Sequence, residues 1–384
     1  MRKQRGRKKK KSKKKKVIRG AVAEISLSAI ANNLRFVKRI TGNRPVIAVV
    51  KADAYGHGSA VISKSLLNEG VSHLAVAFAS EARELRESGI DAPIVVLFDR
   101  EAIADYFDHH LLPVVSSLDT ASRLSEEARK RASRIRIHVK IDTGMGRLGL
   151  HGNDVVQDIM RIADMPGIEI TGLMSHFSEA DLADGSYALT QLERFNAIRG
   201  AVAANLRKPL MSHIANSAAV MTFEQAHLDA VRPGLMLYGY SPFAHLSGGL
   251  IPAMTVKARI LDIRNVPAGT PVSYGRTYVT RRASRIGVMA LGYADGFNRL
   301  FSNNAYVLVK GQNAPVVGKV CMDLTMIDLT DIAGVEENDE VVIIGKQDAQ
   351  SITADDLAMR AGTISYEILT SLGCRSRKVY VEDH

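Results

Sequence analysis

The sequence predicts two domains, an amino-terminal (β/α)8 TIM barrel followed by a mostly antiparallel β domain. Three observations carry this prediction. The chain has 384 residues, which is too long for one ordinary core. Eight short apolar runs alternate with helical patterns over the first two thirds, and strand-like runs separated by turns fill the last third. We place the barrel at 20–250, the β domain at 251–384, and a separate tail at 1–19.

The eight apolar runs are rich in β-branched residues, which favour strands. They cover residues 46–50, 73–78, 94–97, 113–115, 135–141, 168–175, 211–215 and 231–237. Helical patterns lie between most of them, for example at 59–69 and 80–88. In the second of these helices, Ala82 and Leu85 are available for packing and the glutamates are expected to face water. These glutamates are Glu81, Glu84 and Glu87.

The last third changes from alternating helices to short strands. Strand-like runs occur at 256–263, 285–291, 305–309, 324–328 and 340–344, and the helical pattern is at 354–361. The early strand-like run at 20–28 precedes the barrel, so we expect it to pair with 254–263 near the junction of the domains.

The net charge of +11 is concentrated in the tail. Residues 1–19 contain thirteen Lys or Arg and no acid, which leaves 38 basic and 40 acidic residues in the rest of the chain. A polybasic segment without apolar residues is expected to be disordered, and it lacks the apolar core of a signal peptide. Two interpretations stay open: a solvated tail, or weak salt-sensitive attraction to RNA, DNA or anionic lipid.

Cysteine content and hydropathy indicate the compartment. Cys321 and Cys374 are too few for a disulfide framework, which fits a reducing compartment. No apolar stretch approaches the roughly 20 residues that span a bilayer. We therefore expect a cytoplasmic protein without a membrane span.

Unusual polar residues follow the expected barrel strands. Such barrels carry their chemistry at the carboxyl ends of the strands. Lys51 ends the first strand, where an amine beside an apolar wall loses hydration, so its pKa falls and it can attack a carbonyl to form a Schiff base. The alternative for an isolated Val-Val-Lys is a solvated lysine. Asp142 and Arg147 follow the fifth expected strand, His176 ends the sixth, Asn216 and Ser217 end the seventh, and Arg232 lies with Gly234 on the eighth.

Several segments of the chain resemble bacterial alanine racemases, which use pyridoxal 5'-phosphate (PLP). The segments are Val-Val-Lys-Ala-Asp-Ala-Tyr-Gly-His-Gly (49–58), His-Val-Lys-Ile-Asp-Thr-Gly-Met-Gly-Arg-Leu-Gly (138–149), Arg-Pro-Gly-Leu-Met-Leu-Tyr-Gly (232–239), Val-Ser-Tyr-Gly (272–275) and Gly-Tyr-Ala-Asp-Gly (292–296). The resemblance runs from about Ala23 to the carboxyl terminus. It implies a PLP-dependent isomerase that interconverts L- and D-alanine, a homodimer with shared active sites, and D-alanine supply for peptidoglycan.

The resemblance also implies the residues that hold PLP. Lys51 binds the aldehyde, Arg232 lies at the pyridine nitrogen, and His176 holds Arg232 in place. A guanidinium does not readily give up a proton, so the nitrogen stays neutral and transamination is disfavoured. The phosphate is held by Ser217, Tyr55, Tyr366 and the backbone of Gly234 and Leu235, with Asn216 beside them. An alternative for Ser217 is a plain helix N-cap. No metal is assigned.

Racemisation needs two acid/base groups on opposite faces of the substrate carbon. Lys51 serves one face, and by resemblance Tyr274 of the partner subunit serves the other. Met322 and Asp323 come from the same neighbouring domain, and the Met322 N–H binds the substrate carboxylate. The resemblance further places Arg147 at the substrate carboxylate, and Tyr293 with Tyr366 at the entrance. Lys140 matches a position that is often carbamylated, the alternative being an unmodified ion pair.

Rival functions differ in features that the sequence contains. A PLP decarboxylase of the same architecture is disfavoured by Arg232 and by the lack of a Gly-Gly-Gly phosphate loop. A racemase of broader specificity stays open. A non-catalytic PLP-carrier barrel would lack the second domain and Tyr274. A nucleic-acid-binding function would rest on the tail alone.

Overall fold

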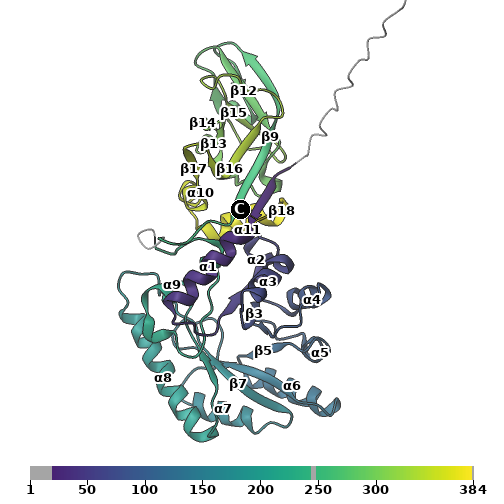
Figure 1. Ribbon diagram of the computed structural model, residues 1–384, viewed down its shortest axis with the longest axis vertical. Helices are drawn as coiled ribbons and strands as arrows, with labels where there is room; N and C mark the ends of the chain where they lie inside the picture. Colours follow the sequence, from purple (N-terminus) through teal and green to yellow (C-terminus); the bar gives the residue numbers. More distant parts are fainter. Residues whose placement is uncertain (1–19, 244–247, 383–384) are drawn as a thin grey trace, which may run out of the picture.

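The computed structural model describes residues 20–243 and 248–382, so the predicted tail at 1–19 lies outside the described residues. The chain forms two domains stacked along the long axis of the molecule, with the barrel below the β domain in Figure 1. Both domains contribute to one continuous apolar core. No helix among the described residues is long and apolar enough to cross a membrane.

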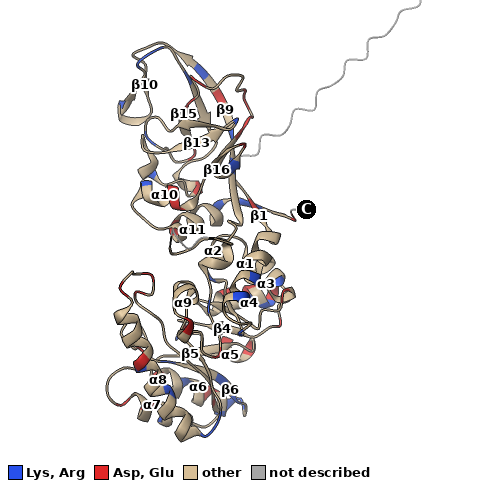
Figure 2. Cartoon of the chain, turned by 60° about the vertical axis from the view of Figure 1, so that its left-hand side comes forward, with Lys and Arg blue, Asp and Glu red and all other residues tan. Residues whose placement is uncertain are grey.

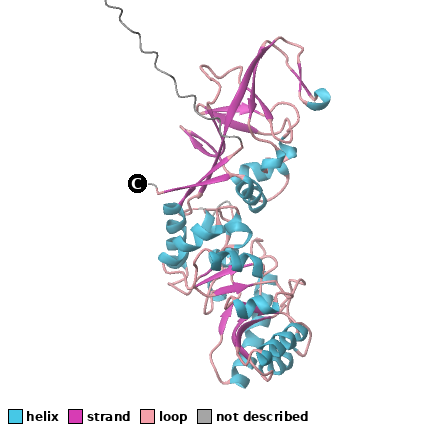
Figure 3. Ribbon diagram, turned by 90° about the vertical axis from the view of Figure 1, so that its right-hand side faces the viewer, coloured by secondary structure: helices cyan, strands magenta, loops and turns pink. Residues whose placement is uncertain are grey.

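Seven parallel strands pair in sequence order in the barrel. They are β2 (Ile47–Val49), β3 (His73–Val76), β4 (Ile94–Val96), β5 (Leu112–Val115), β6 (Ile135–Lys140), β7 (Ile168–Met174) and β8 (Met211–His213). Even the weakest expected run, 113–115, forms a strand. The helices of the barrel lie outside these strands (Figure 3). They are α3 (Ser59–Asn68), α4 (Ala79–Glu87), α5 (Ile103–Asp108), α6 (Leu118–Lys130), α7 (Val155–Ala163), α8 (Ser186–Leu206) and α9 (Ser217–Thr222).

The eighth expected strand, 231–237, is much shorter than predicted. Val231 forms a single parallel bridge with Val46, and the Arg232 N–H donates to the Ala215 carbonyl, so the segment still joins the last strand to the first. Pro233 then removes a backbone donor, and a 3-10 helix replaces the strand. That helix spans Leu235–Tyr238.

The second domain is a nine-stranded sheet that includes the first strand of the chain. β1 (Val22–Ser26) pairs antiparallel with β9 (Met254–Val266), as expected, and parallel with β18 (Arg377–Val381). The other strands are antiparallel. They are β12 (Ser284–Met289), β13 (Tyr306–Val309), β14 (Gln312–Pro315), β15 (Thr325–Asp328), β16 (Glu340–Gln347) and β17 (Gln350–Ile352), beside a separate pair, β10 (Pro271–Val272) and β11 (Tyr278–Val279).

Two helices lie at the junction with the barrel (Figure 1). α10 (Ala354–Ala361) has the predicted bounds, and α11 (Ser365–Arg375) was not expected from the sequence pattern. On the other side of the junction, α1 (Leu27–Ile40) carries the buried Asn33. Its side chain donates to the carbonyls of Leu237 and Ile251 and accepts from the Ile251 N–H. Asn33 thereby joins both ends of the connection between the domains.

Replacing Asn33 by Ala is expected to lower the free energy of unfolding by about 2 kcal/mol, because one buried and two partly buried hydrogen bonds to backbone groups are lost. Asn32→Ala is the matched control, since Asn32 makes one exposed hydrogen bond to the Gly249 carbonyl. Its expected cost is below about 1 kcal/mol. Urea denaturation of both variants measures the difference, and equal costs would contradict the role of Asn33.

Candidate functional site

The polar residues at the carboxyl ends of the barrel strands line one cavity of about 150 Å³. Apolar side chains such as Val49, Leu97 and Met174 complete its wall. The predicted site residues that it brings together are Lys51, Tyr55, Lys140, Arg147, His176, Asn216, Ser217, Arg232, Gly234, Leu235 and Tyr366. The cavity therefore combines two amines, two arginines and several hydroxyl groups.

A left-handed turn presents Lys51 to this cavity. The four residues after it, Ala52 to Tyr55, have φ angles between 51° and 54°, a conformation that costs an L-residue roughly 1–2 kcal/mol. Glu81 compensates by accepting from the Ala52 N–H at 2.6 Å and from two N–H groups at the start of α4. Glu81 was expected to face water, and this expectation was wrong because its carboxylate fixes the turn.

The second domain supports the same turn from the other side. Lys378 on β18 forms an ion pair of 2.8 Å with Asp53. Gly56 ends the turn so close to α11 that a Cβ atom there would lie 2.7 Å from the Leu369 carbonyl oxygen. The position of Lys51 therefore depends on both domains.

Three cations surround the ring of Phe98. The Lys51 Nζ, the Lys140 Nζ and the Arg147 Cζ lie 5.5, 5.4 and 5.4 Å from its centroid. Burial lowers the pKa of Lys51, and the nearby charge of Arg147 lowers it further. The same two causes lower the pKa of Lys140 to about 8. Both amines are thus easier to deprotonate than an exposed lysine, which is what a nucleophilic amine requires.

Arg232 is fixed in the wall of the cavity by hydrogen bonds on both terminal nitrogens. Its Nη1 donates to the Nδ1 of His213 at 2.6 Å and to the His213 carbonyl at 2.8 Å. Its Nη2 donates to the carbonyls of Ser175 and Ile214, and its contact with the Nδ1 of His176 is longer, at 3.3 Å. His176 was expected to hold Arg232, but its contact is the longest of the five. The shorter hydrogen bonds are those to the His213 ring and to three carbonyls. Burial lowers the pKa of Arg232 to about 9, so it stays charged at pH 7.

The loops after the last strands offer hydroxyl and backbone groups close together. The Ser217 hydroxyl accepts from the N–H groups of Gly234 and Met236. A Cβ atom at Gly234 would lie 2.5 Å from the Tyr55 hydroxyl oxygen, so only glycine allows this approach. Asn216, and not Ser217, is the N-cap of α9, since its side chain accepts from the Ala219 N–H.

Four predicted site residues lie outside this cavity. Tyr274 is in a 3-10 turn and is 71% exposed, and Met322 is 53% exposed. Both line another cavity of about 540 Å³ together with Asp323. Figure 2 places β10, which ends two residues before Tyr274, at the end of the second domain remote from the barrel. Tyr293 is also exposed and lines neither cavity.

Sequence reasoning missed two residues of the site. Phe98 follows the β4 strand, and its position at the carboxyl end of a barrel strand was the signal that could have identified it. His213 ends β8 in the run Ser-His-Ile-Ala-Asn-Ser. A histidine within an expected buried strand was the signal that could have identified it.

Comparisons with known proteins agree along almost the whole chain. Residues 25–242 match the family model "Alanine racemase, N-terminal domain" and residues 253–380 match "Alanine racemase, C-terminal domain". The alanine racemase of Thermodesulfovibrio yellowstonii is 48% identical, over 94% of this chain and 97% of that protein. The crystal structure of alanine racemase from D-cycloserine-producing Streptomyces lavendulae has a TM-score of 0.90 at 33% identity, covering 96% of this chain and 99% of that one.

The structure of the Bartonella henselae alanine racemase was determined with covalently bound pyridoxal phosphate. It has a TM-score of 0.85 at 30% identity and covers 94% of this chain and 99% of that one. The residues present here fit that cofactor, because a lysine amine of lowered pKa shares a cavity with a close backbone approach at Gly234 and with fixed donors.

The barrel, its lysine and this donor set define a PLP-dependent enzyme of the barrel-plus-β-domain class. Within that class, the chain belongs to the alanine racemase family, whose members are isomerases.

Glu81→Ala is expected to destabilise the protein by about 3 kcal/mol, because the Ala52 N–H of the strained turn and the N–H groups of Ala77 and Phe78 lose a charged acceptor. Glu84→Ala on the exposed face of the same helix is the matched control, with an expected effect within about 0.5 kcal/mol. Chemical denaturation measures both. A Glu81 variant as stable as the control would show that the turn does not need this carboxylate.

Proposed function

We propose that this protein interconverts L-alanine and D-alanine with PLP held by Lys51. The observation that carries the proposal is that the Lys51 amine and the fixed Arg232 guanidinium line one cavity. When bound, PLP withdraws electrons from the substrate and makes its α-proton easier to remove. The matched relatives support alanine as the substrate. We further propose a cytoplasmic enzyme that supplies D-alanine for peptidoglycan.

Arg232 favours racemisation over other PLP reactions. Its guanidinium is a donor that keeps its proton. None of its five hydrogen-bond contacts is with a carboxylate. When PLP is bound, Arg232 would offer it a hydrogen-bond donor that keeps its own proton, and PLP would then stabilise negative charge on the substrate carbon only weakly. We infer that this carbon regains a proton quickly, which disfavours transamination.

The remaining cavity residues bind the phosphate of PLP or hold other site residues in place. We infer that the phosphate is held by Ser217, Tyr55, Tyr366 and the backbone of Gly234 and Leu235, because these residues line the cavity and carry hydroxyl or backbone N–H groups. Asn216 orders the same loop by capping α9. His176 assists His213 in holding Arg232.

Arg147 binds the substrate carboxylate as the most exposed cation of the cavity wall. Lys140 lies among Lys51, Arg147 and Arg232, which all lower its pKa. A carbamate on Lys140 would reverse its charge, relieve this repulsion and orient Arg147. This is the state that we propose for Lys140.

Lys51 moves a proton on one face of the substrate carbon, and Tyr274 of the partner subunit moves it on the other. Support comes from the placement of Tyr274, Met322 and Asp323 on a cavity of the second domain that lies apart from Lys51 in the same chain. The Met322 N–H then binds the substrate carboxylate, and Tyr293 with Tyr366 narrows the entrance to a size that suits a methyl side chain.

Lys51→Ala is expected to remove the visible absorbance of lysine-bound PLP and to lower racemisation at least about a thousandfold, because the anchor and one base are lost together. Lys64→Ala, an exposed lysine on α3, is the control and should behave as the wild type. The measurements are an absorption spectrum and an assay of D-alanine formed from L-alanine. Normal activity with borohydride-reducible PLP on another lysine would overturn the assignment.

The shared site is tested by mixing two inactive variants, Lys51→Ala and Tyr274→Phe. In a heterodimer one site receives both substitutions and the other keeps Lys51 and Tyr274 intact, so random exchange is expected to restore about a quarter of wild-type sites. The measurement is alanine turnover after co-refolding equal amounts, with size-exclusion evidence for subunit exchange. No recovery despite proven exchange would rule out a site shared between subunits.

A further inference from the structure

A buried pair of histidines continues the hydrogen-bond network of Arg232 away from the active site. The Nε2 of His213 lies 2.8 Å from the Nδ1 of His138, and both side chains are at most 2% exposed. Burial lowers the pKa of both imidazoles, that of His138 to about 3, so both are neutral at pH 7. Each ring therefore has one donor and one acceptor nitrogen.

The contact with Arg232 determines which nitrogen of each ring carries the proton. A guanidinium only donates, so the Nδ1 of His213 accepts and its proton lies on Nε2. This Nε2–H donates to the Nδ1 of His138, so the proton of His138 lies on its own Nε2. Within 20–243 and 248–382, the hydrogen bond to His213 is the only one that the His138 ring makes, and His138 also lines a second cavity.

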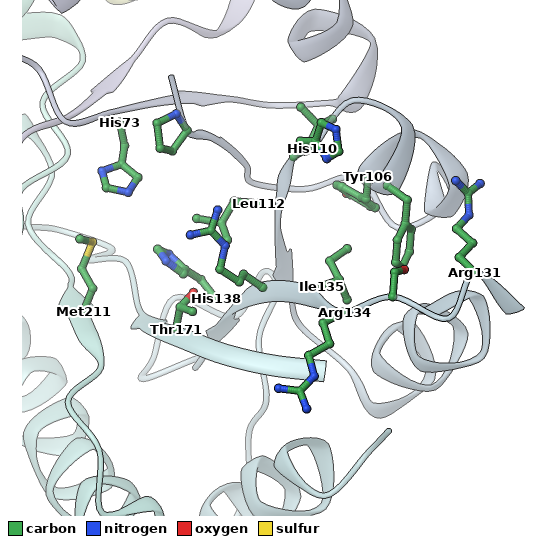
Figure 4. A pocket seen from close by; sticks show the side chains of 15 residues that line it. His73, Tyr106, His110, Leu112, Arg131, Arg134, Ile135, His138, Thr171 and Met211 are labelled. Atoms are coloured by element: carbon green, nitrogen blue, oxygen red, sulfur yellow. The ribbon is translucent and has the colours of Figure 1, made fainter. Parts of the chain in front are cut away.

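This second cavity lies at the amino-terminal end of the barrel, opposite the active site. It has a volume of about 690 Å³, and its lining includes the first residues of three strands, His73, Ile135 and Met211. Figure 4 shows His73 and His138 on one side of it and Tyr106, His110 and Arg131 on the other. The buried Nδ1 of His73 has no partner among the described residues.

The lining of this cavity is basic. It contains Arg131, Arg134 and Arg136, and none of its described lining residues is acidic. Arg131 is paired with Asp108 and Glu127, whereas Arg134 and Arg136 form no ion pair within 20–243 and 248–382. Arginine forks and imidazole N–H groups are donors that suit oxyanions, and the volume is that of a small-molecule site.

We propose that this basal cavity binds a small, multiply charged oxyanion, a phosphate or a carboxylate, and that the His138–His213 pair connects it to Arg232. An acceptor at the Nε2–H of His138 makes its Nδ1 a better acceptor for His213. His213 in turn becomes a better acceptor for Arg232. A free metabolite in the basal cavity thereby changes the hydrogen bonding of Arg232, the residue that would contact PLP in the proposed function.

Isothermal titration of the PLP-loaded enzyme with pyrophosphate, and separately with citrate, tests the binding site. One site per chain is expected for at least one of these probes. The double variant Arg134→Gln/Arg136→Gln is expected to weaken binding at least tenfold, and the matched variant Arg129→Gln on the exposed face of α6 should change it less than twofold. Circular dichroism checks that the variants are folded. No binding of either probe, or equal binding by the double variant, would overturn the site.

Nitrogen-15 NMR of the histidine rings tests the connection. The bound probe is expected to shift the ring signals of both His138 and His213 in the wild type and neither signal in the double variant. A shift confined to His138 would overturn the connection to Arg232. Neither readout depends on racemase activity, so failure here is distinguishable from failure of the proposed function.

Discussion

The burial of the Arg232 guanidinium constrains the active-site end of the barrel more than any other interaction. Removing a cation from water is costly unless its donors are satisfied, and no carboxylate of the described residues pairs with this one. Its partners are instead the carbonyls of Ser175, His213 and Ile214 and two imidazole nitrogens. The ends of β7 and β8 must therefore turn their carbonyls inward. The shortened eighth strand keeps Arg232 at this end of the barrel, because its N–H donates to the Ala215 carbonyl and the carbonyl of the next residue, Pro233, accepts from the Val49 N–H.

The strained backbone that follows Lys51 is likewise held in place by its surroundings. Four successive residues in a left-handed turn are unfavourable on their own, and they persist because Glu81, Lys378 and α11 fix them from three directions. Two of these supports belong to the second domain. The β domain thus helps to position the amine of the barrel, and the two domains share a continuous apolar core.

Local pattern in the sequence was enough for most of the fold but for only part of the site. Apolar, β-branched runs identify β2 to β8, because a strand buried on both faces has that composition whatever its neighbours are. Lys51 was identifiable because it follows such a run, and Arg232 because it lies within one. His213 was not, because its role comes from His138 and Arg232, which are 75 and 19 residues away in the chain. Glu81 was misjudged for the same reason, since its partner Ala52 lies on another strand–helix connection.

The exposed Tyr274 and Met322 set a further constraint on how the chain can work. A barrel with Lys51 alone can remove and return a proton on one face of a substrate carbon, and this leaves the configuration unchanged. Inversion requires a second group on the other face, and within one chain the cavity that contains Tyr274 lies apart from the cavity of Lys51. Assembly with a second copy is thus a requirement of the chemistry that we propose. A loss of dimer contacts is therefore expected to remove racemisation while leaving Lys51 and its support by Glu81 in place.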